Sequence, residues 1–553
     1  MKPRKQFLHF LFLVIFFTAT SCKKEFKVEE IPPVTGFWEL NGKSSIDLSK
    51  QFDIVIYGGT PAGIMGAIEG VRSGKNVLLI NHTEGALGGM LTNGLGNTDV
   101  LHPEILGGLS REFFKRIKDY YSNQSNWFVK NSPKYGWDPS LVDIMVRFEP
   151  RAAQTVFKDL IMTHSLPILH KERIKLKNGV GKRNGIIEWI EMESGKRVKG
   201  KVFIDASYEG DLMAGAKVSY IVGREANSVY GESFNGIYVA DNTNRNQIPD
   251  GVKINVSNFS SIPFGTRGGG DSKVQAYCYR MCLTDVADNM VKIEKPHDYD
   301  ESNYELLFKY LEKHNGTDFF DLSLIPNRKT DSNNSGPVST DFVGANYQYP
   351  EGDYVLREEI RRKHKSYQLG LMWTLQNHPA VPGKIKNHCI RWGLAKDEFS
   401  ENNNWPLQLY IREARRMVGS YIMTEHNCNN SVDAPYSIGL ADYPMDSHIV
   451  QRFTNEFGHI KNEGQIMARV PNPYKIDFRS LIPKENECKN LIVPVCLSAS
   501  HIAYGSIRME PIYMTLGQVS TIIAINSILE KKPVQKIDYI KLKESMLKRG
   551  MVY

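Results

Sequence analysis

Residues 58–63, Gly-Gly-Thr-Pro-Ala-Gly, place three glycines where an apolar segment gives way to a helical pattern. The first N–H groups of a helix have no intrahelical acceptor and the helix dipole is positive there, so this position attracts a diphosphate. A dinucleotide-binding turn has a glycine where this chain has Thr60. We still predict that a dinucleotide pyrophosphate binds this turn, with a ligand-free glycine-rich turn as the alternative. The predicted contacts are Gly58, Gly59, Thr60, Pro61, Ala62 and Gly63.

A second group of small and polar residues follows the next apolar segment. Asn81 stands where an acidic residue commonly binds ribose hydroxyls, and its amide can still form such a hydrogen bond. No arginine lies there, so nothing favours a 2′-phosphate. Residues 84–99 then contain five glycines. We expect this segment to pass along the cofactor, with a surface loop as the alternative. The predicted contacts are Gly88, Gly89, Met90 and Thr92.

Near the C-terminus, His501 is the side chain best suited to proton transfer, because histidine changes charge near neutral pH. It lies among small and polar residues, and we predict His501 and Tyr504 as catalytic residues and Arg508 as a cofactor contact. A structural role for His501 and an ion pair between Arg508 and Glu510 are the alternatives. Glu209, after an earlier strand, is predicted to meet the substrate unless it caps a helix.

These residues need a scaffold that brings remote parts of the chain together. A strand over 53–57, a helix with apolar residues three and four apart, and a strand over 76–80 predict a βαβ unit. Residues 183–192 and 196–204 predict a hairpin. We expect its second strand to end beside the cofactor at Asp205 and Ala206.

Two further elements are predicted in the C-terminal half. Residues 490–497 read as a strand, followed by a loop over 498–511 and a helix. We expect this helix to present Gly517 and Gln518 at its positive end to the cofactor, where negative charge develops on reduction. Residues 412–425 read as a helix with Ala414 and Met417 on its apolar face.

The composition limits the function classes. With 553 residues the chain exceeds one typical core, so we expect two or more domains. The net charge is +8, but Lys and Arg are scattered, which argues against nucleic-acid binding. No Cys pair has CxxC spacing, which argues against a thioredoxin-like redox pair and a compact iron–sulfur site. Cys278 and Cys282 read as buried thiols, and no metal site is predicted.

The first 22 residues predict an export signal. A basic start and an apolar stretch over 7–17 precede the small residues before Cys22. Cys22 in this position resembles the lipid attachment site of bacterial lipoproteins. We therefore predict a signal peptide over 1–22, a lipidated Cys22, a tether over 23–50, and an exported protein that meets the membrane only through this lipid.

Five longer segments carry the most specific signal, namely 274–285 (VQAYCYRMCLTD), 339–354 (STDFVGANYQYPEGDY), 412–425 (REARRMVGSYIMTE), 443–452 (YPMDSHIVQR) and 498–511 (SASHIAYGSIRMEP). Together with the turn at 58–63 they resemble the FAD-dependent oxidoreductase family of bacterial secreted proteins, distantly related to the flavoprotein subunit of heterodisulfide reductase. The resemblance implies bound FAD and redox chemistry, and it supplies no substrate. The cysteine clusters of those relatives are not visible here, so no iron–sulfur cofactor is implied.

The resemblance also implies the architecture. We expect an α/β fold with a discontinuous Rossmann-like FAD-binding domain of the glutathione-reductase type and an inserted mixed α+β substrate domain. The FAD-binding domain is assigned to 50–110, 150–225 and 485–530, the substrate domain to 226–484, and a C-terminal helical tail to 531–553.

The expected function follows from these parts. We predict an exported, lipid-anchored FAD-dependent oxidoreductase that oxidises a small hydroxylated, carbohydrate-like substrate by transfer to flavin N5. No second glycine-rich βαβ motif is visible, so electrons are expected to pass to an external acceptor. The alternative is a cell-surface polysaccharide-binding or lyase protein with a non-redox Rossmann unit, in which His501, Tyr504 and Arg508 act on a uronate.

Overall fold

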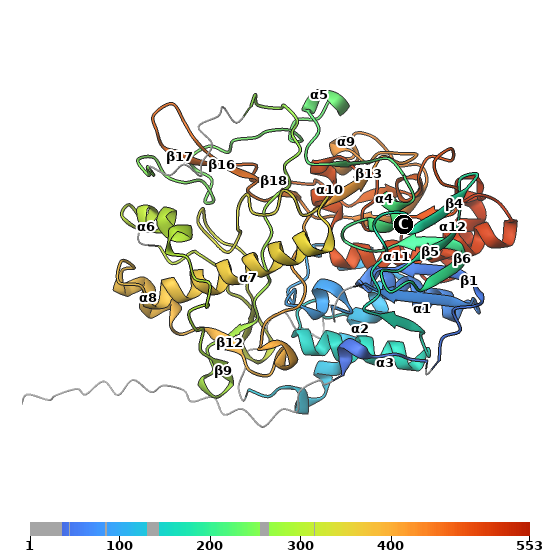
Figure 1. Cartoon of the computed structure of the whole chain (residues 1–553), viewed down its shortest axis with the longest axis horizontal. Helices are drawn as coiled ribbons and strands as arrows, with labels where there is room; N and C mark the ends of the chain where they lie inside the picture. Colours follow the sequence, from blue (N-terminus) through green and yellow to red (C-terminus); the bar gives the residue numbers. More distant parts are fainter. Residues whose placement is uncertain (1–35, 44, 83–85, 130–142, 255–264, 315) are drawn as a thin grey trace, which may run out of the picture.

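The computed structural model describes residues 36–43, 45–82, 86–129, 143–254, 265–314 and 316–553. The predicted signal peptide and the lipidation site Cys22 lie outside the described residues. Figure 1 shows a sheet-and-helix region built from the N-terminal part of the chain (blue and teal) and its C-terminal part (red). A second region, from the middle of the chain, lies beside it and is crossed by the long helix α7 (Tyr354–Asn377).

A mostly parallel sheet forms the centre of the first region. β1 pairs in parallel with β2 and β6, β2 pairs with β3, and β20 pairs with β6, whereas β4 and β5 are antiparallel. The strands, in sheet order, are β3 (Ile168–His170), β2 (Val77–Asn81), β1 (Gln51–Tyr57), β6 (Arg197–Asp205), β5 (Ile186–Glu191) and β4 (Val180–Arg183), with β20 (Leu491–Ile492) on β6. The predicted βαβ unit and hairpin are therefore confirmed, and the fold is α/β.

Helices α1 (Pro61–Arg72) and α11 (Glu510–Glu530) pack closely because glycines face each other. A Cβ on Gly66 would lie 2.9 Å from the carbonyl oxygen of Gly517, and the Thr521 hydroxyl donates to the Gly66 carbonyl at 2.8 Å. Within the described residues, α11 is the one helix long and apolar enough to cross a membrane, and 89% of that stretch is buried as in a core helix. Three more helices complete this region: α2 (Gly108–Ser122), α3 (Pro150–Thr163) and α12 (Tyr539–Leu547).

The second region contains a small sheet and several two-stranded ribbons. The sheet consists of β10 (Ser323–Ile325), β11 (Lys329–Asp331), β8 (Leu283–Thr284), β12 (Gly393–Ala395) and β9 (Met290–Val291). The ribbons are β13 (Arg415–Met417) with β7 (Tyr220–Val222), β14 (Ser437–Ala441) with β19 (Tyr474–Asp477), β15 (Met445–Ser447) with β18 (Ile466–Ala468), and β16 (Gln451–Thr454) with β17 (Ile460–Glu463). The short helices are α4 (Asp211–Gly215), α5 (Asn227–Tyr230), α6 (Glu305–Leu311), α8 (Gly383–Cys389), α9 (Glu425–Cys428) and α10 (His501–Ile507).

A buried ion-pair group joins the two regions. Asp211, at the start of α4, accepts two hydrogen bonds from Arg357 of α7, at 2.6 and 2.9 Å, and one from Arg415 of β13 at 2.8 Å. Burial acts to raise the pKa of Asp211, but the two guanidinium groups outweigh it and lower the pKa to about 2. The carboxylate therefore stays ionised and holds α7 against the sheet region.

Three sequence-based predictions of secondary structure are wrong. Residues 412–424 form no helix and contain the strand β13, in which Arg415–Met417 pair with Tyr220–Val222. The predicted strand 490–497 is limited to Leu491–Ile492. The predicted loop 498–511 contains α10, and α11 begins at Glu510, so Gly517 and Gln518 lie in the second and third turns of a helix and not at its start.

The six described cysteines are all free and buried, which confirms the buried thiols at Cys278 and Cys282. The structure also brings Glu149, Asp397 and Glu398 together with ligand atoms within 4.8 Å of one another, an arrangement that the sequence did not predict. The Nζ atom of Lys329 lies 2.7, 2.6 and 2.7 Å from these three carboxylates. The Lys329 ammonium group therefore already balances negative charge of these carboxylates.

Candidate active site

The turn after β1 has the geometry that its glycines predict. Gly58 has φ +119°, and a Cβ there would lie 2.5 Å from the backbone of Ala206 and Ser207 beyond β6. Thr60 is the N-cap of α1: its hydroxyl accepts from the Gly63 N–H at 3.3 Å and donates to the Ala206 carbonyl at 2.7 Å. Thr60 thus replaces the usual glycine with a side chain that is occupied by the helix and by the end of β6.

Unused backbone donors converge at this turn. The N–H groups of Gly59, Thr60 and Ala62 donate to no described residue, and all three residues are buried. Buried N–H groups normally have partners, and at a positive helix end an anion is the favoured one. These residues therefore fit a dinucleotide diphosphate.

The position in the sheet supports the same conclusion. β2 lies on one side of β1 and β6 on the other, so the chain reverses its direction of travel across the sheet at this point. Ligands of open α/β sheets bind beyond the carboxyl ends of the strands at such a switch point. The turn at 58–63 and Ala206 lie at that edge.

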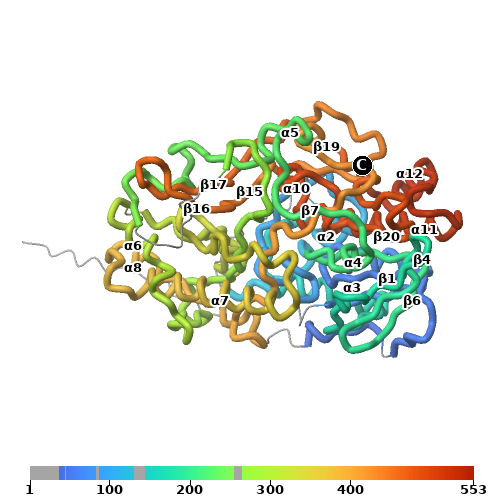
Figure 2. Tube along the Cα trace, turned by 45° about the horizontal axis from the view of Figure 1, so that its top comes forward, coloured from blue at the N-terminus to red at the C-terminus, as the bar shows by residue number. Residues whose placement is uncertain are grey.

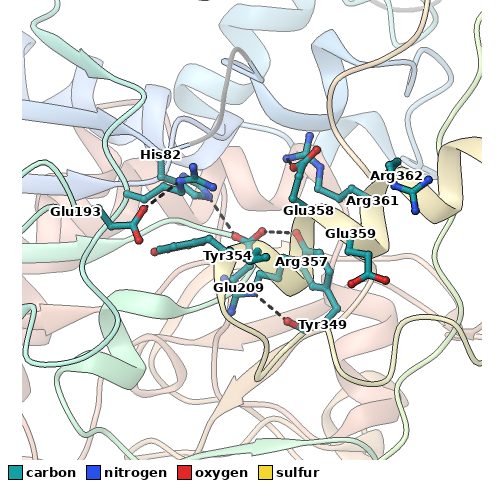
Figure 3. Close-up of a pocket in the computed structure, with 12 residues that line it drawn as sticks. His82, Glu193, Glu209, Tyr349, Tyr354, Arg357, Glu358, Glu359, Arg361 and Arg362 are labelled. Atoms are coloured by element: carbon teal, nitrogen blue, oxygen red, sulfur yellow. Dashed lines mark hydrogen bonds and ion pairs between the residues drawn. The ribbon is translucent and has the colours of Figure 1, made fainter.

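A cleft of about 620 Å³ opens beside the turn, beyond the ends of β2 and β3 (Figure 3). His82 lies in it, with its ring 5.1 Å from that of Tyr57, the last residue of β1. Arg173 lines it from the segment after β3, and Tyr354 and Arg357 line it from α7. The adenosine half of a dinucleotide fits here, because it lies next to strands two and three in Rossmann folds.

Glu209 lies in this cleft rather than beside His501. Its Oε2 is 3.2 Å from His82 Nε2, and its Oε1 accepts from the Tyr349 hydroxyl at 3.2 Å (Figure 3). Burial acts to raise the pKa of Glu209, but the contact with His82 and the charge of Arg357 lower it overall. The structure therefore places Glu209 at the cofactor end of the site, and its predicted catalytic role has no support from this position.

Asn81 and Asp205 end their strands as predicted. Asn81 lies against Gly59, where a Cβ would overlap its side-chain oxygen, and its amide nitrogen is 3.5 Å from His170 Nδ1. Asp205 accepts from the Ser207 N–H at 3.1 Å and from the Met213 N–H at 2.8 Å. Burial raises its pKa to about 6, with the hydrogen bonds from Ser207 and Met213 acting to lower it. Asp205 therefore holds the turn after β6, next to the dinucleotide turn.

The predicted cofactor loop lies on this turn. The Gly88 N–H donates to the Gly59 carbonyl at 2.7 Å, and Gly88 and Gly89 adopt positive φ values of +83° and +50°. The Met90 N–H donates to the Tyr208 hydroxyl at 3.1 Å. Thr92 instead uses its hydroxyl inside the loop, donating to the Leu87 carbonyl at 2.7 Å. Gly88 to Met90 are thus brought to the turn, whereas Thr92 shapes the loop.

His501 begins α10 and belongs to a buried relay of three side chains. Its Nδ1 is 2.7 Å from Glu413 Oε2, and its Nε2 is 3.1 Å from Ser447 Oγ. Figure 2 shows α10 next to β15, the strand that ends at Ser447. Burial acts to raise the pKa of Glu413, but the charges of His501 and Arg416 lower it to about 2. An ionised carboxylate on Nδ1 prepares the imidazole to accept a proton at Nε2.

A second buried chain of polar groups, the polar cluster, adjoins this relay. It runs from Arg412 through Asp341 (2.9 Å), His448 (3.0 Å), Asp446 (3.3 Å) and Arg508 (2.8 Å), and then to the Tyr410 hydroxyl (2.9 Å). Arg508 therefore pairs with Asp446, so the alternative pairing with Glu510 is wrong. The Nε atoms of Arg412 and Arg508 have no hydrogen-bond partner among the described residues. Buried donors without partners mark a place where a polar ligand compensates them.

The remaining predicted residues are occupied by contacts within the protein. Tyr504 follows His501 in α10, and burial, together with the nearby Cys496 and Glu413, raises its pKa. The Tyr504 hydroxyl accepts from Tyr513 at 2.7 Å. Gly517 packs on α1, where a Cβ would overlap the Ala62 carbonyl. Gln518 accepts from the Leu109 N–H and donates to Glu69, at 2.8 and 2.9 Å. Gln518 therefore seats α11 on its neighbours, whereas Gly517 touches the cofactor turn through Ala62. Neither residue lies at the start of the helix, contrary to the prediction.

The sequence reasoning missed the partners that complete the site. Glu413 lies beside Arg412 in a segment with three arginines, and Ser447 precedes His448 in YPMDSHIVQR. Glu510 and Tyr208 meet across the site at 2.5 Å. These segments combine small residues with many charged and aromatic ones, and this composition could have indicated that they belong to the site. Their pairing, however, required the fold.

Comparisons with solved structures return distant, partial likenesses. They include bacillithiol disulfide reductase from Staphylococcus aureus (16% identity, 29% of this chain and 38% of that one, TM-score 0.19). They also include GidA from Aquifex aeolicus (13% identity, 33% and 34%, TM-score 0.22) and L-amino acid deaminase from Proteus vulgaris (16% identity, 33% and 63%, TM-score 0.21). The chain thus covers less than two thirds of each, and likenesses this low carry no argument about activity.

A search of the curated proteins returns no match. The sequence profile of the family described as FAD dependent oxidoreductase matches residues 53–546, which is most of the chain. This range begins in β1 and includes the turn, the cleft residues, the His501 relay and the polar cluster. The chain therefore belongs to the FAD-dependent oxidoreductase family and is an FAD-dependent enzyme.

Proposed function

We propose that this enzyme oxidises a small, neutral, hydroxylated substrate of carbohydrate-like chemistry and passes the electrons to an external acceptor. The observation that carries the proposal is the buried relay of Ser447, His501 and Glu413. Oxidation of an alcohol requires removal of a hydroxyl proton and of a hydride from the same carbon. The relay supplies a group for the first of these tasks.

Bound FAD supplies the acceptor for the hydride. The protein residues handle the proton: His501 Nε2, now 3.1 Å from the Ser447 hydroxyl, takes the proton of a substrate hydroxyl directly or through Ser447. Glu413 fixes the ring through Nδ1 and stabilises the imidazolium that results. A carbonyl forms as the carbon–hydrogen bond breaks, so two electrons and two hydrogens leave the substrate.

Charge balance in the polar cluster supports a neutral substrate. Its two arginines, Arg412 and Arg508, lie 2.9 and 2.8 Å from Asp341 and Asp446, so no cation is left to neutralise a uronate. Burial acts to raise the pKa of Asp446, but His448 and Arg508 lower it to about 2, which keeps the pair ionised. The lyase alternative needs an unpaired arginine beside the base, and both arginines of this cluster are paired.

Hydroxylated ligands match the unpartnered groups. The Nε donors of Arg412 and Arg508 and the Thr340 hydroxyl lack partners within the described part of the chain, and all three side chains are buried. Hydroxyl groups can accept from such donors as well as donate. A polyol therefore compensates this site better than an apolar molecule does.

We also infer the finer features predicted from the sequence. The FAD-binding region is proposed to be of the glutathione-reductase type with an inserted substrate domain; the long β6, which pairs with the β4–β5 hairpin and with β20, supports this. A distant relation to the flavoprotein subunit of heterodisulfide reductase is part of the same inference. The protein is proposed to be exported and anchored by lipid on Cys22.

Two experiments test the proposal. Purified enzyme is mixed without oxygen with a panel of sugars, other alcohols and amino acids, and loss of the flavin absorbance is followed. Bleaching by alcohols or sugars, slowed about 100-fold or more in His501→Gln, is expected. His459→Gln is the matched control, because His459 also faces a carboxylate, Asp250 at 3.3 Å, but at the surface. Bleaching only by amines would contradict the substrate class.

For localisation, Cys22→Ser is expected to move the protein from the membrane fraction to the soluble exported fraction. An unchanged membrane fraction would refute lipid anchoring at Cys22. Activity of the Cys22→Ser protein serves as the control for folding, since Cys22 precedes the region matched by the family.

A further inference from the structure

Glu510 begins α11 two residues after Arg508, between the polar cluster and the loop that contains Gly88 to Met90. The side chain is buried, and its Oε1 accepts from the Tyr208 hydroxyl at 2.5 Å. Tyr208 in turn accepts from the Met90 N–H at 3.1 Å. A continuous hydrogen-bond chain therefore joins the loop to the start of α11.

The other carboxyl oxygen, Oε2, has no hydrogen-bond partner among the described residues. A buried carboxyl oxygen without a partner destabilises the protein, so its retention points to a ligand that is bound in the working enzyme. The adjoining elements are those that the dinucleotide turn gathers around the cofactor: Gly88 donates to Gly59, and a Cβ on Gly89 would lie 2.9 Å from Pro61.

The groups that face Glu510 are tyrosines, and none of them is a cation that would favour its ionised form. Tyr208 faces it from the segment after β6, and Tyr513 faces it from the next turn of α11. The guanidinium of Arg508 is directed to Asp446 instead, at 2.8 Å. Burial raises the pKa of Glu510 to about 8, although the hydrogen bond from Tyr208 acts to lower it. With Oε1 accepting from Tyr208, the proton lies on Oε2 and is available to a ligand.

We propose that Glu510, oriented by Tyr208, donates a hydrogen bond from Oε2 to the isoalloxazine ring of FAD and so acts as a positioning residue for the flavin. The inference uses FAD binding by the family and does not depend on the substrate class proposed above. A failed substrate screen therefore leaves it intact, because its tests need no substrate.

The proposal has a direct consequence for redox chemistry. Ionisation of Glu510 removes the donated hydrogen bond and puts a negative charge beside the ring, which disfavours the more negative reduced flavin. The flavin of the native enzyme should therefore become harder to reduce above the pKa of Glu510 than the flavin of a variant that cannot ionise.

The experiment compares Glu510→Gln with the native enzyme and with Glu530→Gln, a control at the far end of the same helix. The flavin midpoint potential is measured from pH 7 to pH 9, on either side of the Glu510 pKa of about 8. The potential of the native enzyme minus that of Glu510→Gln is expected to fall by about 20–30 mV over this range. The upper value, tenfold in the preference for reduced over oxidised FAD, is the most that one group with this pKa can give. The native enzyme and Glu530→Gln should agree. A difference between native enzyme and Glu510→Gln that does not change with pH would overturn the proposal.

Tyr208→Phe provides a second arm that also covers a Glu510→Gln protein that fails to fold. It deletes the hydroxyl that orients Glu510 and that accepts from the Met90 N–H. Apoprotein is titrated with FAD by flavin fluorescence at pH 7, and its unfolding midpoint is measured beside that of the native apoprotein. A fivefold or greater loss of FAD affinity in apoprotein that still unfolds cooperatively is expected. Unchanged affinity would show that the Tyr208–Glu510 pair does not position the flavin.

Discussion

Substitution of Gly63 by alanine tests whether the turn after β1 holds the diphosphate. A Cβ on Gly63 would overlap the carbonyl oxygen of Gly58, far inside the 3.0 Å that real Cβ atoms keep from other heavy atoms. The obstacle is backbone, so no rotamer change can relieve it. Overpacking of this kind costs about 1–3 kcal/mol, and we expect the upper half of that range. Because the strain falls on the turn itself, about 2–3 kcal/mol of FAD binding, or about 30- to 150-fold in affinity, should be lost.

Two other glycines make the experiment a graded series. A Cβ on Gly66, one helical turn further along α1, would lie 2.9 Å from the Gly517 carbonyl oxygen and 3.0 Å from the Thr521 hydroxyl. Gly66→Ala should therefore reduce stability by about 1 kcal/mol and leave FAD affinity within about threefold. Gly383 begins α8, and nothing lies within 4 Å of a Cβ there, so Gly383→Ala should be neutral or slightly stabilising.

The assay pairs FAD titration of the apoprotein with denaturant unfolding of the same preparations. Affinity should decrease in the order Gly383→Ala, Gly66→Ala, Gly63→Ala, and only Gly63→Ala should lose more than about threefold. If Gly63→Ala folds and binds FAD as tightly as the native protein, the diphosphate does not use this turn and the assignment is wrong.

Three further predictions concern buried charges. Lys329→Met leaves three carboxylates without their cation and should lower the free energy of unfolding in urea by about 3–5 kcal/mol near pH 8. This loss of stability should shrink towards pH 5, because protonated carboxyls no longer repel one another. The exposed control Lys309→Met should change the free energy of unfolding little. Asp211→Asn leaves buried arginines unpaired, and a loss of about 3–5 kcal/mol at pH 7 is expected. The native Asp211 contribution is present above the unfolded pKa and lost as pH falls through about 2, so an unchanged pH 7 stability would contradict the pairing. Glu413→Gln should lower the rate of anaerobic flavin reduction about 100-fold with FAD still bound; an unchanged rate would remove His501 from proton transfer.

Local patterns were sufficient for the cofactor half of the site. The apolar strand, the glycines and the helical spacing after Tyr57 have only one common arrangement, and the structure has it. The departure at Thr60 had no explanation in the sequence, because its reason lies in a contact with Ala206, which is 146 residues away. The same applies to Gly517, whose position inside α11 follows from packing on α1.

The substrate half could be predicted only in part. His501 was identified by its chemistry, but its partners Glu413 and Ser447 lie 88 and 54 residues away. The segment 412–425 has a helical spacing of apolar residues, yet Arg415–Met417 within it pair with β7 and form a strand. Tertiary contacts override the weak local preference for a helix.

The sequence by itself determined the βαβ unit, the glycine turn, the hairpin into β6 and the membership of a flavin-dependent family, because these depend on neighbours within a few dozen residues. Only the tertiary structure decided which acids meet His501, Arg508 and Tyr208, and that Glu510 and not Gly517 begins α11. The physical reason is that buried charges and hydrogen-bonding groups must find partners wherever the fold places them. Those partners come from distant segments, and no spacing along the chain records them.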